Sequence, residues 1–298
     1  MRVIYDIEKN AGVIERCISK HGFLPEHNYH HFACLKSPNK KRVFFMFEKD
    51  TGVMVSISKN HVWKVIAEPL APKELRCMIL HKIFEYALKR GSKVVVEVSE
   101  EMKNELIASI SYSKKFKSRP INYILYWPVY NLQEFDERLE GKNWKKIRNI
   151  INKFRKSGAC IVPAKCLTKE SLHNLVEIWA RTRKIRDRIN LRYYHNIINS
   201  NFNGFDDAHS VVIRDTPVAL TGGWKIPNSK DYYSCLGISD HRINGVSEFA
   251  NISELLLAKK KGYSKVDFGG SDQQLLNFKK KFRPKEIYKT YVFSIVKK

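Results

Sequence analysis

The sequence lacks any long hydrophobic run: within its 298 residues there is no stretch of about 18 apolar residues that could cross a membrane. Its first residues, MRVIYDIEKN, have neither the apolar segment of a signal peptide nor the composition of a transit peptide. We therefore expect a cytoplasmic protein without an integral membrane segment. Hydrophobic residues still form 43% of the chain and aromatic residues 12%, which is enough to fill the cores of one large domain or two ordinary ones.

The cysteines and histidines lack any metal-binding pattern. The six cysteines are scattered without a CxxC pair, and the ten histidines form no cluster at ligand spacing. Neither a zinc site nor a disulfide framework is indicated, so we expect no metal, no resident cofactor, and reduced cysteines that mostly pack in the interior. No histidine is assigned a catalytic role.

Acidic residues are few: 30 Asp and Glu stand against 54 Lys and Arg, a formal net charge of +24. Such a field attracts polyanions, so nucleic acid, anionic lipid and phosphorylated metabolites are candidate partners. Nucleotide bias in the genome is an alternative source of part of the excess. Clustering favours binding, because residues 141–169 contain nine basic residues and no acidic one. Two smaller basic clusters follow at 181–192 and 279–289.

The first third of the chain predicts a helix followed by strands. A helix is expected over about residues 8–20, before Gly22, and then the strands HFACLK, RVFFMFEK, GVMVSISK and HVWKVIAE with turn sequences between them. After Pro72, apolar residues at helical spacing predict a second helix that ends at Gly91 and precedes a strand at 94–98. This order predicts an antiparallel meander followed by a helical crossover.

The second half repeats this order, with strands expected at 210–214, 218–226 and 232–238, a helix at 246–261 and a strand at 265–268. Residues 87–94 (ALKRGSKV) and 258–266 (AKKKGYSKV) match almost residue for residue with one insertion. We predict an α/β (α+β) protein of two tandem halves, 1–130 and 131–298, each a mixed, largely antiparallel sheet flanked by helices. Two helices are expected within 132–157. The alternative to duplication is that Lys and Gly are separately favoured where any helix ends.

Two stretches resemble known transferases. Residues 139–154, LEGKNWKKIRNIINKF, resemble the segment that joins the two halves in the family that includes the catalytic domain of phosphatidylglycerol lysyltransferase. Residues 261–271 (KGYSKVDFGGS) and 276–282 (LNFKKKF) are similar to the end of the second domain in Fem-type peptidoglycan aminoacyltransferases. Both groups share a tandem acetyltransferase-like (GNAT) fold. The resemblance is good from about residue 132 onwards and implies that fold here.

The resemblance also implies transfer of an acyl group, in many members an aminoacyl group from its tRNA ester, to an amine or a hydroxyl. In Fem-type enzymes a Phe-Lys pair after the second-half strand is associated with transfer, and Phe278 and Lys279 match it. The helical arm of some Fem-type enzymes and the membrane spans of the lysyltransferase have no counterpart in this sequence. The acceptor therefore stays open between a small molecule, a peptide and a lipid head group.

Lys279 and Asp267 are the residues expected to carry the chemistry. An aminoacyl ester is already activated, so the enzyme must orient the acceptor and stabilise the tetrahedral oxyanion. We expect Lys279 near the start of a short helix, where its ammonium could do this; the alternative is a solvated lysine in a basic run. Asp267 ends an apolar strand and is either a general base or a cap for the following glycine turn.

The remaining candidates would bind the donor or the substrate. Arg148 and Asn149 lie on a lysine-rich helix suited to a phosphate of tRNA, lipid or nucleotide, with a solvated basic face as the alternative. Alternation along one strand places Tyr232 and Tyr233 on opposite faces. Ser271 can instead cap the next helix together with Asp272. The candidate binding residues are Lys145, Lys146, Arg148, Asn149, Tyr233, Gly269, Gly270, Ser271 and Arg283.

One motif is missing. Acyl-CoA-dependent acetyltransferases hold the CoA pyrophosphate in a Gln/Arg-x-x-Gly-x-Gly/Ala loop, which neither half contains. The favoured function is therefore an acyltransferase that takes an aminoacyl group from aminoacyl-tRNA. An acyl-CoA or acyl-carrier donor is the alternative, and a nucleic-acid-binding protein on a degenerate transferase scaffold is the second alternative. The sequence does not specify an oligomeric state.

Overall fold

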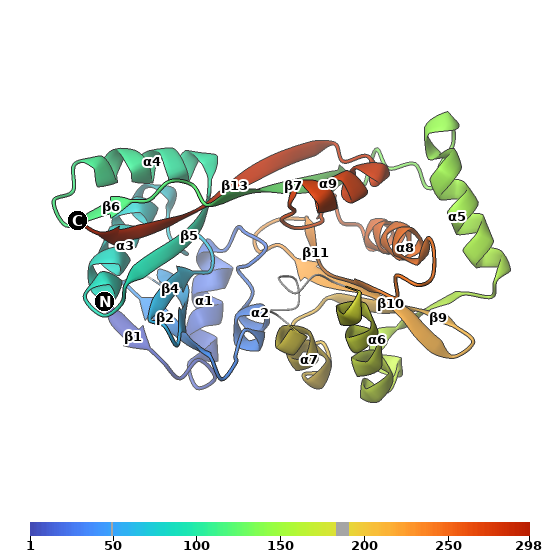
Figure 1. The fold of residues 1–298 in the computed structure, drawn as a ribbon, viewed down its shortest axis with the longest axis horizontal. Coiled ribbons are helices and arrows are strands. Elements are labelled where there is room, and N and C mark those ends of the chain that lie inside the picture. Colours follow the sequence, from blue (N-terminus) through green and yellow to red (C-terminus); the bar gives the residue numbers. More distant parts are fainter. Residues whose placement is uncertain (49, 183–190) are drawn as a thin grey trace.

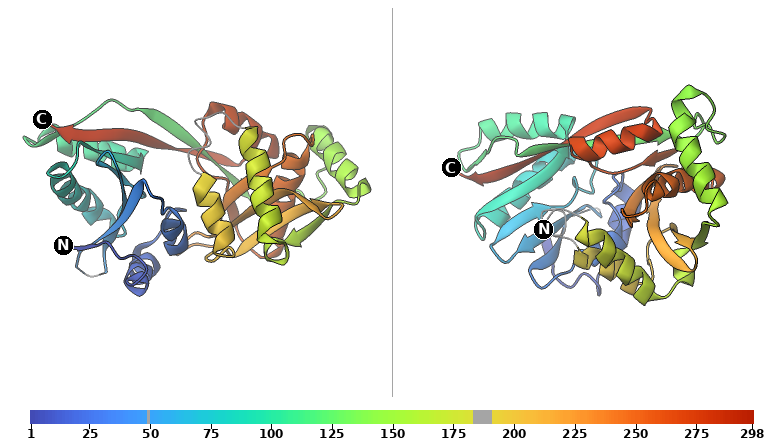
Figure 2. Two further views of the ribbon diagram at one scale, coloured as in Figure 1. Left: turned by 60° about the horizontal axis from the view of Figure 1, so that its bottom comes forward. Right: turned by 45° about the vertical axis from the view of Figure 1, so that its right-hand side comes forward.

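The computed structural model describes residues 1–48, 50–182 and 191–298, so most of the basic cluster at 181–192 lies outside the described residues. The chain forms two lobes side by side, with both termini on the first lobe and two long strands running from one lobe to the other (Figure 1). The further views show helices on both faces of the sheet in each lobe (Figure 2).

The first lobe contains the elements up to residue 118, and the second contains most of the rest. In the first lobe these are β1 (Arg2–Ile4), α1 (Ala11–His21), α2 (Tyr29–Cys34), β2 (Lys40–Met46), β3 (Gly52–Ser58), β4 (Val62–Val65), α3 (Lys73–Leu88), β5 (Lys93–Ser99), α4 (Glu100–Ser111) and β6 (Phe116–Ser118). In the second they are the 3₁₀ turn η1 (Lys142–Trp144), α5 (Lys145–Lys156), β8 (Cys160–Pro163), η2 (Ala164–Cys166), α6 (Lys169–Arg181), α7 (Leu191–Asn199), β9 (Asp207–Ile213), β10 (Thr216–Lys225), β11 (Tyr232–Ser239), α8 (Val246–Lys260), β12 (Lys265–Asp267), α9 (Gln273–Lys279) and η4 (Lys280–Phe282).

The two lobes share a single sheet because two strands cross between them. These strands are β7 (Tyr123–Asn131) and β13 (Glu286–Lys297), and the sheet order is β1-β2-β3-β4-β5-β13-β7-β12-β11-β10-β9-β8, with β6 beside β13. β7 follows the first half in sequence but pairs with β12 of the second. β13 follows the second half but pairs with β5 of the first. Each half thus completes its sheet with a strand from the other.

The two similar segments found in the sequence occupy equivalent places. Residues 87–94 lead from α3 into β5, which pairs in parallel with β4, and residues 258–266 lead from α8 into β12, which pairs in parallel with β11. In both cases the strand's other neighbour, β13 or β7, is antiparallel. The expected α/β architecture of two similar halves is confirmed. The boundary between residues 130 and 131 stays a prediction.

Each half buries apolar side chains on both faces of the sheet. On β2, the neighbouring residues Phe44 and Phe45 point to opposite faces: Phe44 packs under α1 and α2, and Phe45 packs under α3. β13 contributes Tyr291, Phe293 and Ile295 to the core of the first half, although it is the last strand of the chain. The stability of the first half therefore depends on the C-terminus.

One expected strand is a helix. HFACLK was predicted as a strand, but α2 covers Tyr29–Cys34. The Asn28 side chain accepts a hydrogen bond from the backbone N–H of His31 at 2.9 Å, which caps the helix at its N-terminus. Phe32 is fully buried on its inner face. A local side-chain cap thus overrides the alternating pattern of the sequence.

The connecting segment contains one α-helix where two were expected. Asp136 accepts hydrogen bonds from the backbone N–H groups of Arg138 and Glu140, which fold residues 136–140 into a turn. Gly141 then adopts a φ of +83°, and only α5 follows. α5 lies at the far end of the second lobe and packs on α8, with Phe154 stacked on Phe249 at 5.0 Å between ring centroids (Figure 1).

Candidate active site between the two halves

β12 ends in the middle of the sheet, between β7 and β11, and its last residue, Asp267, is buried. Its Oδ1 accepts a hydrogen bond from the backbone N–H of Gly269 at 2.7 Å, and its Oδ2 accepts one from the Tyr288 hydroxyl at 2.6 Å. Gly269 has a φ of +76°, which favours glycine. Asp267 therefore caps the glycine turn, one of its two predicted roles, and is tied to β13 by Tyr288.

Lys279 is the last residue of α9, so its expected position near the start of a helix is wrong. The helix begins after Asp272, whose side chain accepts a hydrogen bond from the backbone N–H of Leu275 at 2.9 Å. The Lys279 ammonium turns back and donates to the carbonyl oxygens of Phe268 and, at 3.1 Å, Gly269. It is therefore not a solvated lysine of the basic run. These bonds use two of the three N–H donors of the ammonium group.

Asp267 and Lys279 both have pKa values shifted toward neutrality. Burial raises the pKa of Asp267 to about 6, although the Tyr288 hydrogen bond, the Gly269 N–H and the charge of Lys279 each lower it. Burial lowers the pKa of Lys279 to about 8, opposed by the charge of Asp267. Near pH 7 the first is mainly ionised and the second mainly protonated, and both can exchange a proton close to neutral pH.

Aromatic rings enclose the glycine turn. Trp127 on β7 stacks on Tyr288 of β13 with ring centroids 5.6 Å apart, and Tyr233 on β11 lies 6.3 Å from Trp127. A Cβ atom at Gly269 would come within 3.3 Å of the Tyr233 ring, and one at Gly270 within 3.1 Å of Trp127. The two glycines thus allow the turn to approach these rings closely.

Two other predicted residues have packing or backbone roles. Ser271 is buried, its backbone N–H donates to the carbonyl of Tyr126, and its hydroxyl donates to the carbonyl of Gly269 at 3.2 Å. The capping role that the sequence also allowed falls to Asp272 alone. The ring of Phe278 packs on Phe282 at 5.3 Å between centroids, so it holds η4 against the core rather than facing Asp267.

Tyr232 and Tyr233 lie on opposite faces of β11, as alternation predicted. On the Tyr232 face, Glu254 of α8 is buried and accepts hydrogen bonds from the hydroxyls of Ser234 at 2.8 Å and Tyr232 at 3.4 Å. Burial raises the pKa of Glu254 to about 8. Sequence reasoning missed this residue, although a single acidic residue within the apolar run ISELLLA was a signal.

A small cavity lies beside β7 and β13, on the side of the first half. Its volume is about 40 Å³, and its lining includes Glu26, Glu68, Glu97, Trp127, Tyr288 and Thr290. Thr290 accepts a hydrogen bond from the Trp127 indole N–H at 2.8 Å and donates one to Glu97 at 2.9 Å. Tyr288 therefore lines this cavity and also contacts Asp267. Among the acidic residues that line the cavity, only Glu97 stands out in the sequence, because it is the one charged residue within the strand VVVEV.

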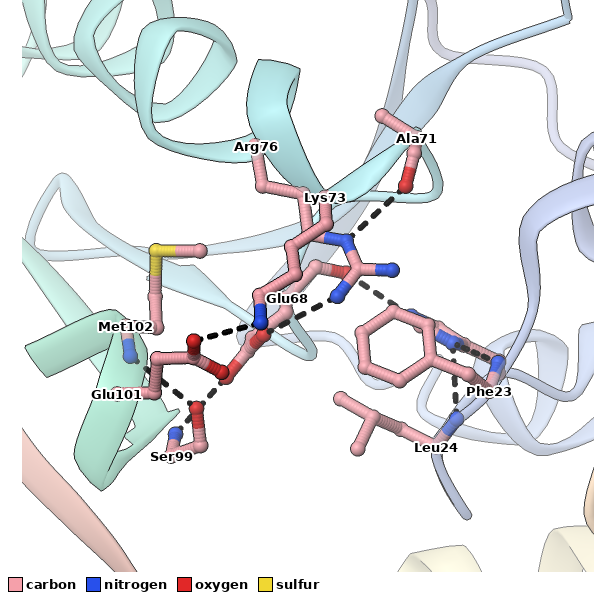
Figure 3. A network of polar contacts seen from close by, with 10 residues as sticks. Phe23, Leu24, Glu68, Ala71, Lys73, Arg76, Ser99, Glu101 and Met102 are labelled. Carbon is pink, nitrogen blue, oxygen red and sulfur yellow. Dashed lines mark hydrogen bonds and ion pairs between the residues drawn. The ribbon is translucent and has the colours of Figure 1, made fainter. Parts of the chain in front are cut away.

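One wall of the cavity is built by a polar network that Figure 3 shows. The Glu68 carboxylate accepts a hydrogen bond from the backbone N–H of Ser99 at 2.8 Å and lies 4.0 Å from the Arg76 guanidinium. Arg76 also covers the Phe23 ring, 3.7 Å from its centroid. His27 Nδ1 accepts from the backbone N–H groups of Phe23 and Leu24, so its proton is on Nε2, which donates to the Glu68 carbonyl at 2.9 Å.

The predicted phosphate-binding residues lie on the outer surface of the second half. Lys145, Lys146 and Asn149 are exposed on α5. Arg148 instead donates to the carbonyl oxygens of Leu139 and, at 3.3 Å, Gly141, so its guanidinium braces the turn before the helix.

Arg283 is also exposed, and its guanidinium lies over the ring of Trp144, 5.2 Å from the centroid. It thus links the end of α9 and η4 to the start of α5. The structure does not bring the α5 residues into the Asp267 turn.

Two kinds of feature are absent from the described part of the chain. Within residues 1–48, 50–182 and 191–298, no group of three or more His, Cys, Asp or Glu side chains is arranged to hold a metal ion. Over the same ranges, no helix combines the length and apolar character needed to span a bilayer.

Solved structures with the same fold define the class of protein. The C-terminal domain of a lysylphosphatidylglycerol synthetase assigned in Agrobacterium fabrum superposes with a TM-score of 0.67 at 15% identity, covering 96% of this chain and 92% of that one. L-PGS from Bacillus licheniformis gives 0.67 at 13% identity, covering 95% and 90%. FemX gives 0.61 at 11% identity, covering 99% and 97%. The chain is a tandem GNAT-like protein.

A family model described as "Phosphatidylglycerol lysyltransferase, C-terminal" matches residues 21–294. This range is nearly the whole chain and includes most of both halves, all of β7, most of β13 and the Asp267 turn. The chain belongs to this family. No curated protein matches it in sequence.

Proposed function

We propose that this protein is an aminoacyltransferase that moves an aminoacyl group from aminoacyl-tRNA to an amine or hydroxyl acceptor. The observation that carries the proposal is membership, over residues 21–294, of a family described by lysyl transfer to phosphatidylglycerol. Two features of the chain support it: a polar site in the middle of the shared sheet, and a separate exposed basic helix. A lipid head group and a small amine can each supply the hydroxyl or amine that accepts the group. We also propose that the protein acts in the cytoplasm.

The proposed reaction exchanges one bond for another at the ester carbonyl. The acceptor nitrogen or oxygen bonds to the carbonyl carbon, the bond to the tRNA 3′ oxygen breaks, and that oxygen leaves with the proton that the acceptor gives up, returned to it from Asp267. Lys279 would stabilise the tetrahedral oxyanion with its remaining N–H donor. Tyr288 would pass the acceptor's proton to Asp267, because its hydroxyl already donates to that carboxylate at 2.6 Å.

The surface charge supports a polynucleotide donor. α5 presents its lysines away from the core that Ile147, Ile151 and Phe154 fill, so they are available to phosphates along one face. A CoA donor is less well supported, since the start of α8 offers one glycine, Gly245, where a pyrophosphate loop needs several close backbone N–H groups.

The direct test is a transfer assay with defined donors. Purified protein is incubated with a pool of charged tRNAs, and in parallel with acyl-CoA, each with a lipid extract and with a mixture of small amines. We expect loss of the aminoacyl ester and a new amide or ester product by mass spectrometry. Consumption of acyl-CoA alone would favour the alternative donor. Binding of tRNA without any transfer would favour a nucleic-acid-binding protein on this scaffold.

A further inference from the structure

Glu26 is a carboxylic acid inside the cavity without a partner. Among the described residues, no other residue donates a hydrogen bond to its carboxyl group or forms an ion pair with it within 4.0 Å. Burial and, to a smaller extent, the negative charge of Glu97 raise the pKa of Glu26 to about 8. Ionising such a group is costly unless a cation joins it. The charge of an incoming cation would lower this pKa again and favour the carboxylate.

The loop that carries Glu26 is held by its neighbours rather than by Glu26 itself. The indole N–H of Trp224, on β10 of the second half, donates to the carbonyl of Pro25 at 2.8 Å. His27 binds the carbonyl of Glu68 in the first half. Asn28 donates to the carbonyl of Gly204 at 3.2 Å. The loop is thus fixed to both halves by groups other than the carboxyl group of Glu26.

The other walls of the cavity suit a cation with a short carbon chain. Its lining contains three glutamates and no lysine or arginine. Glu68 is already bound by Ser99 and Arg76, and Glu97 by Thr290 and, at 3.9 Å, Lys64, so Glu26 is the acid left for a ligand. Trp127 and Tyr288 also line the cavity, and aromatic rings attract ammonium groups. A phosphate would be repelled here.

We propose that this cavity binds an organic ammonium group, held by Glu26 against the wall formed by Trp127 and Tyr288. A volume of about 40 Å³ is about the space of three water molecules, which holds an ammonium head and one or two carbon atoms. Because Tyr288 also contacts Asp267, the ammonium would lie next to the proposed reaction centre. The identity of the substrate that carries it rests on the proposed function: it is the side-chain amine of the aminoacyl group or the amine of the acceptor.

Binding is tested without turnover, using ethylammonium, which has two carbons as the cavity allows, and its neutral isostere ethanol as calorimetric titrants at pH 7. We expect the intact protein to bind ethylammonium at least about tenfold more tightly than ethanol, as one charge-assisted hydrogen bond would provide. Glu26→Gln keeps the shape and removes the charge, so it should lose that preference. Glu15→Gln, an exposed glutamate on α1, is the matched control and should keep it.

Thermal stability separates a binding acid from a structural one. Glu26→Gln removes an unpartnered acid, so its melting temperature should be unchanged or higher while its ammonium preference disappears. A large fall in melting temperature would instead mark Glu26 as structural and overturn the proposal. Equal affinity for ethylammonium and ethanol in the intact protein would also overturn it.

The source of the ammonium is read from transfer kinetics. If the aminoacyl group brings it, Glu26→Gln should reduce transfer from lysyl-tRNA about tenfold more than from leucyl-tRNA, as removal of one charge-assisted hydrogen bond would. If the acceptor brings it, Glu26→Gln should raise the KM for an amine acceptor equally with both donors. Either result supports ammonium binding in the cavity. If no transfer occurs at all, the proposed function is contradicted. The calorimetric titration then still decides whether the cavity binds an ammonium group.

Discussion

At the scale of single residues, Lys279 combines a lowered pKa with hydrogen bonds to the turn beside Asp267. If its ammonium stabilises charge only in the transition state, Lys279→Met should lower the single-turnover rate by about a hundredfold and leave donor affinity nearly unchanged. The substitution also leaves the carbonyls of Phe268 and Gly269 without a donor, so we expect some loss of stability. The measurement is rapid-quench transfer with saturating donor.

The pH profile distinguishes chemistry from packing at Lys279. The wild-type rate should fall above about pH 8 as the ammonium loses its proton, and Lys279→Met should lack that limb. Lys281→Met removes a lysine that pairs with Glu248 at the surface and should keep both the rate and the profile. A normal single-turnover rate for Lys279→Met would show that the role of Lys279 is purely structural.

His27 makes the loop before α2 sensitive to acid. Burial lowers its pKa to about 4 from an ordinary value of 6.5, so the unfolded chain binds more protons between these values. The contribution of His27 to stability is therefore complete above about pH 6.5 and is lost as the pH falls toward 4. We expect wild-type unfolding free energy, measured by urea titration, to decline over this range.

His27→Ala should cost about 2–4 kcal/mol at pH 7, because two backbone N–H groups and one carbonyl lose a buried partner. The cost should shrink as the pH approaches 4. His241→Ala, which changes an exposed histidine, should leave both the stability and its pH dependence close to wild type. A pH-independent cost for His27→Ala would contradict the assigned tautomer.

At the scale of elements, α5 is an amphipathic helix whose basic face is open. Arg148 is committed to the turn before it, so the lysines are the better test of nucleic-acid binding. Changing Lys145, Lys146 and Lys153 to Glu should weaken tRNA binding and flatten its salt dependence, by about one unit of the log–log slope for each phosphate that is no longer neutralised. Affinity is measured by filter binding over a salt series.

The matched control for α5 reverses three exposed lysines on the opposite lobe. Lys40, Lys41 and Lys59 lie on or beside β2 and β3, far from α5 (Figure 1). Changing them to Glu alters the net charge equally and should leave the salt slope nearly unchanged. If both triple variants weaken binding alike, the overall charge, and not α5, attracts tRNA.

At the scale of the whole molecule, the exchange of β7 and β13 should make the two halves unfold together. Phe293 of β13 is fully buried in the core of the first half. Phe293→Ala should cost about 3–5 kcal/mol. Because β13 also pairs with β7, which in turn completes the sheet of the second half, amides of β3 and β10 should lose equal protection in hydrogen exchange. Unchanged protection in β10 would show that the halves are independent.

Local patterns were enough to predict much of this molecule. Periodicity and turn residues predicted α3, β5, α8 and β12 to within a few residues, and the repeated segments ending at Val94 and Val266 predicted two similar halves. These signals succeed because each depends on neighbours within one element. The predicted α/β class and the GNAT-like fold are confirmed.

Only the tertiary structure decided the rest, since it depends on residues far apart in sequence. Nothing in the alternation of residues 286–297 indicates that they pair with β5 of the other half, and nothing in the loop around Glu26 indicates that it faces Glu97 and Tyr288. The sequence by itself determined most of the elements and the basic surface of α5, and it singled out Asp267 and Lys279 as candidates. Only folding placed residues from distant parts of the chain around one cavity. The burial of each side chain there, and the charge near it, depend on segments that are far apart in the sequence.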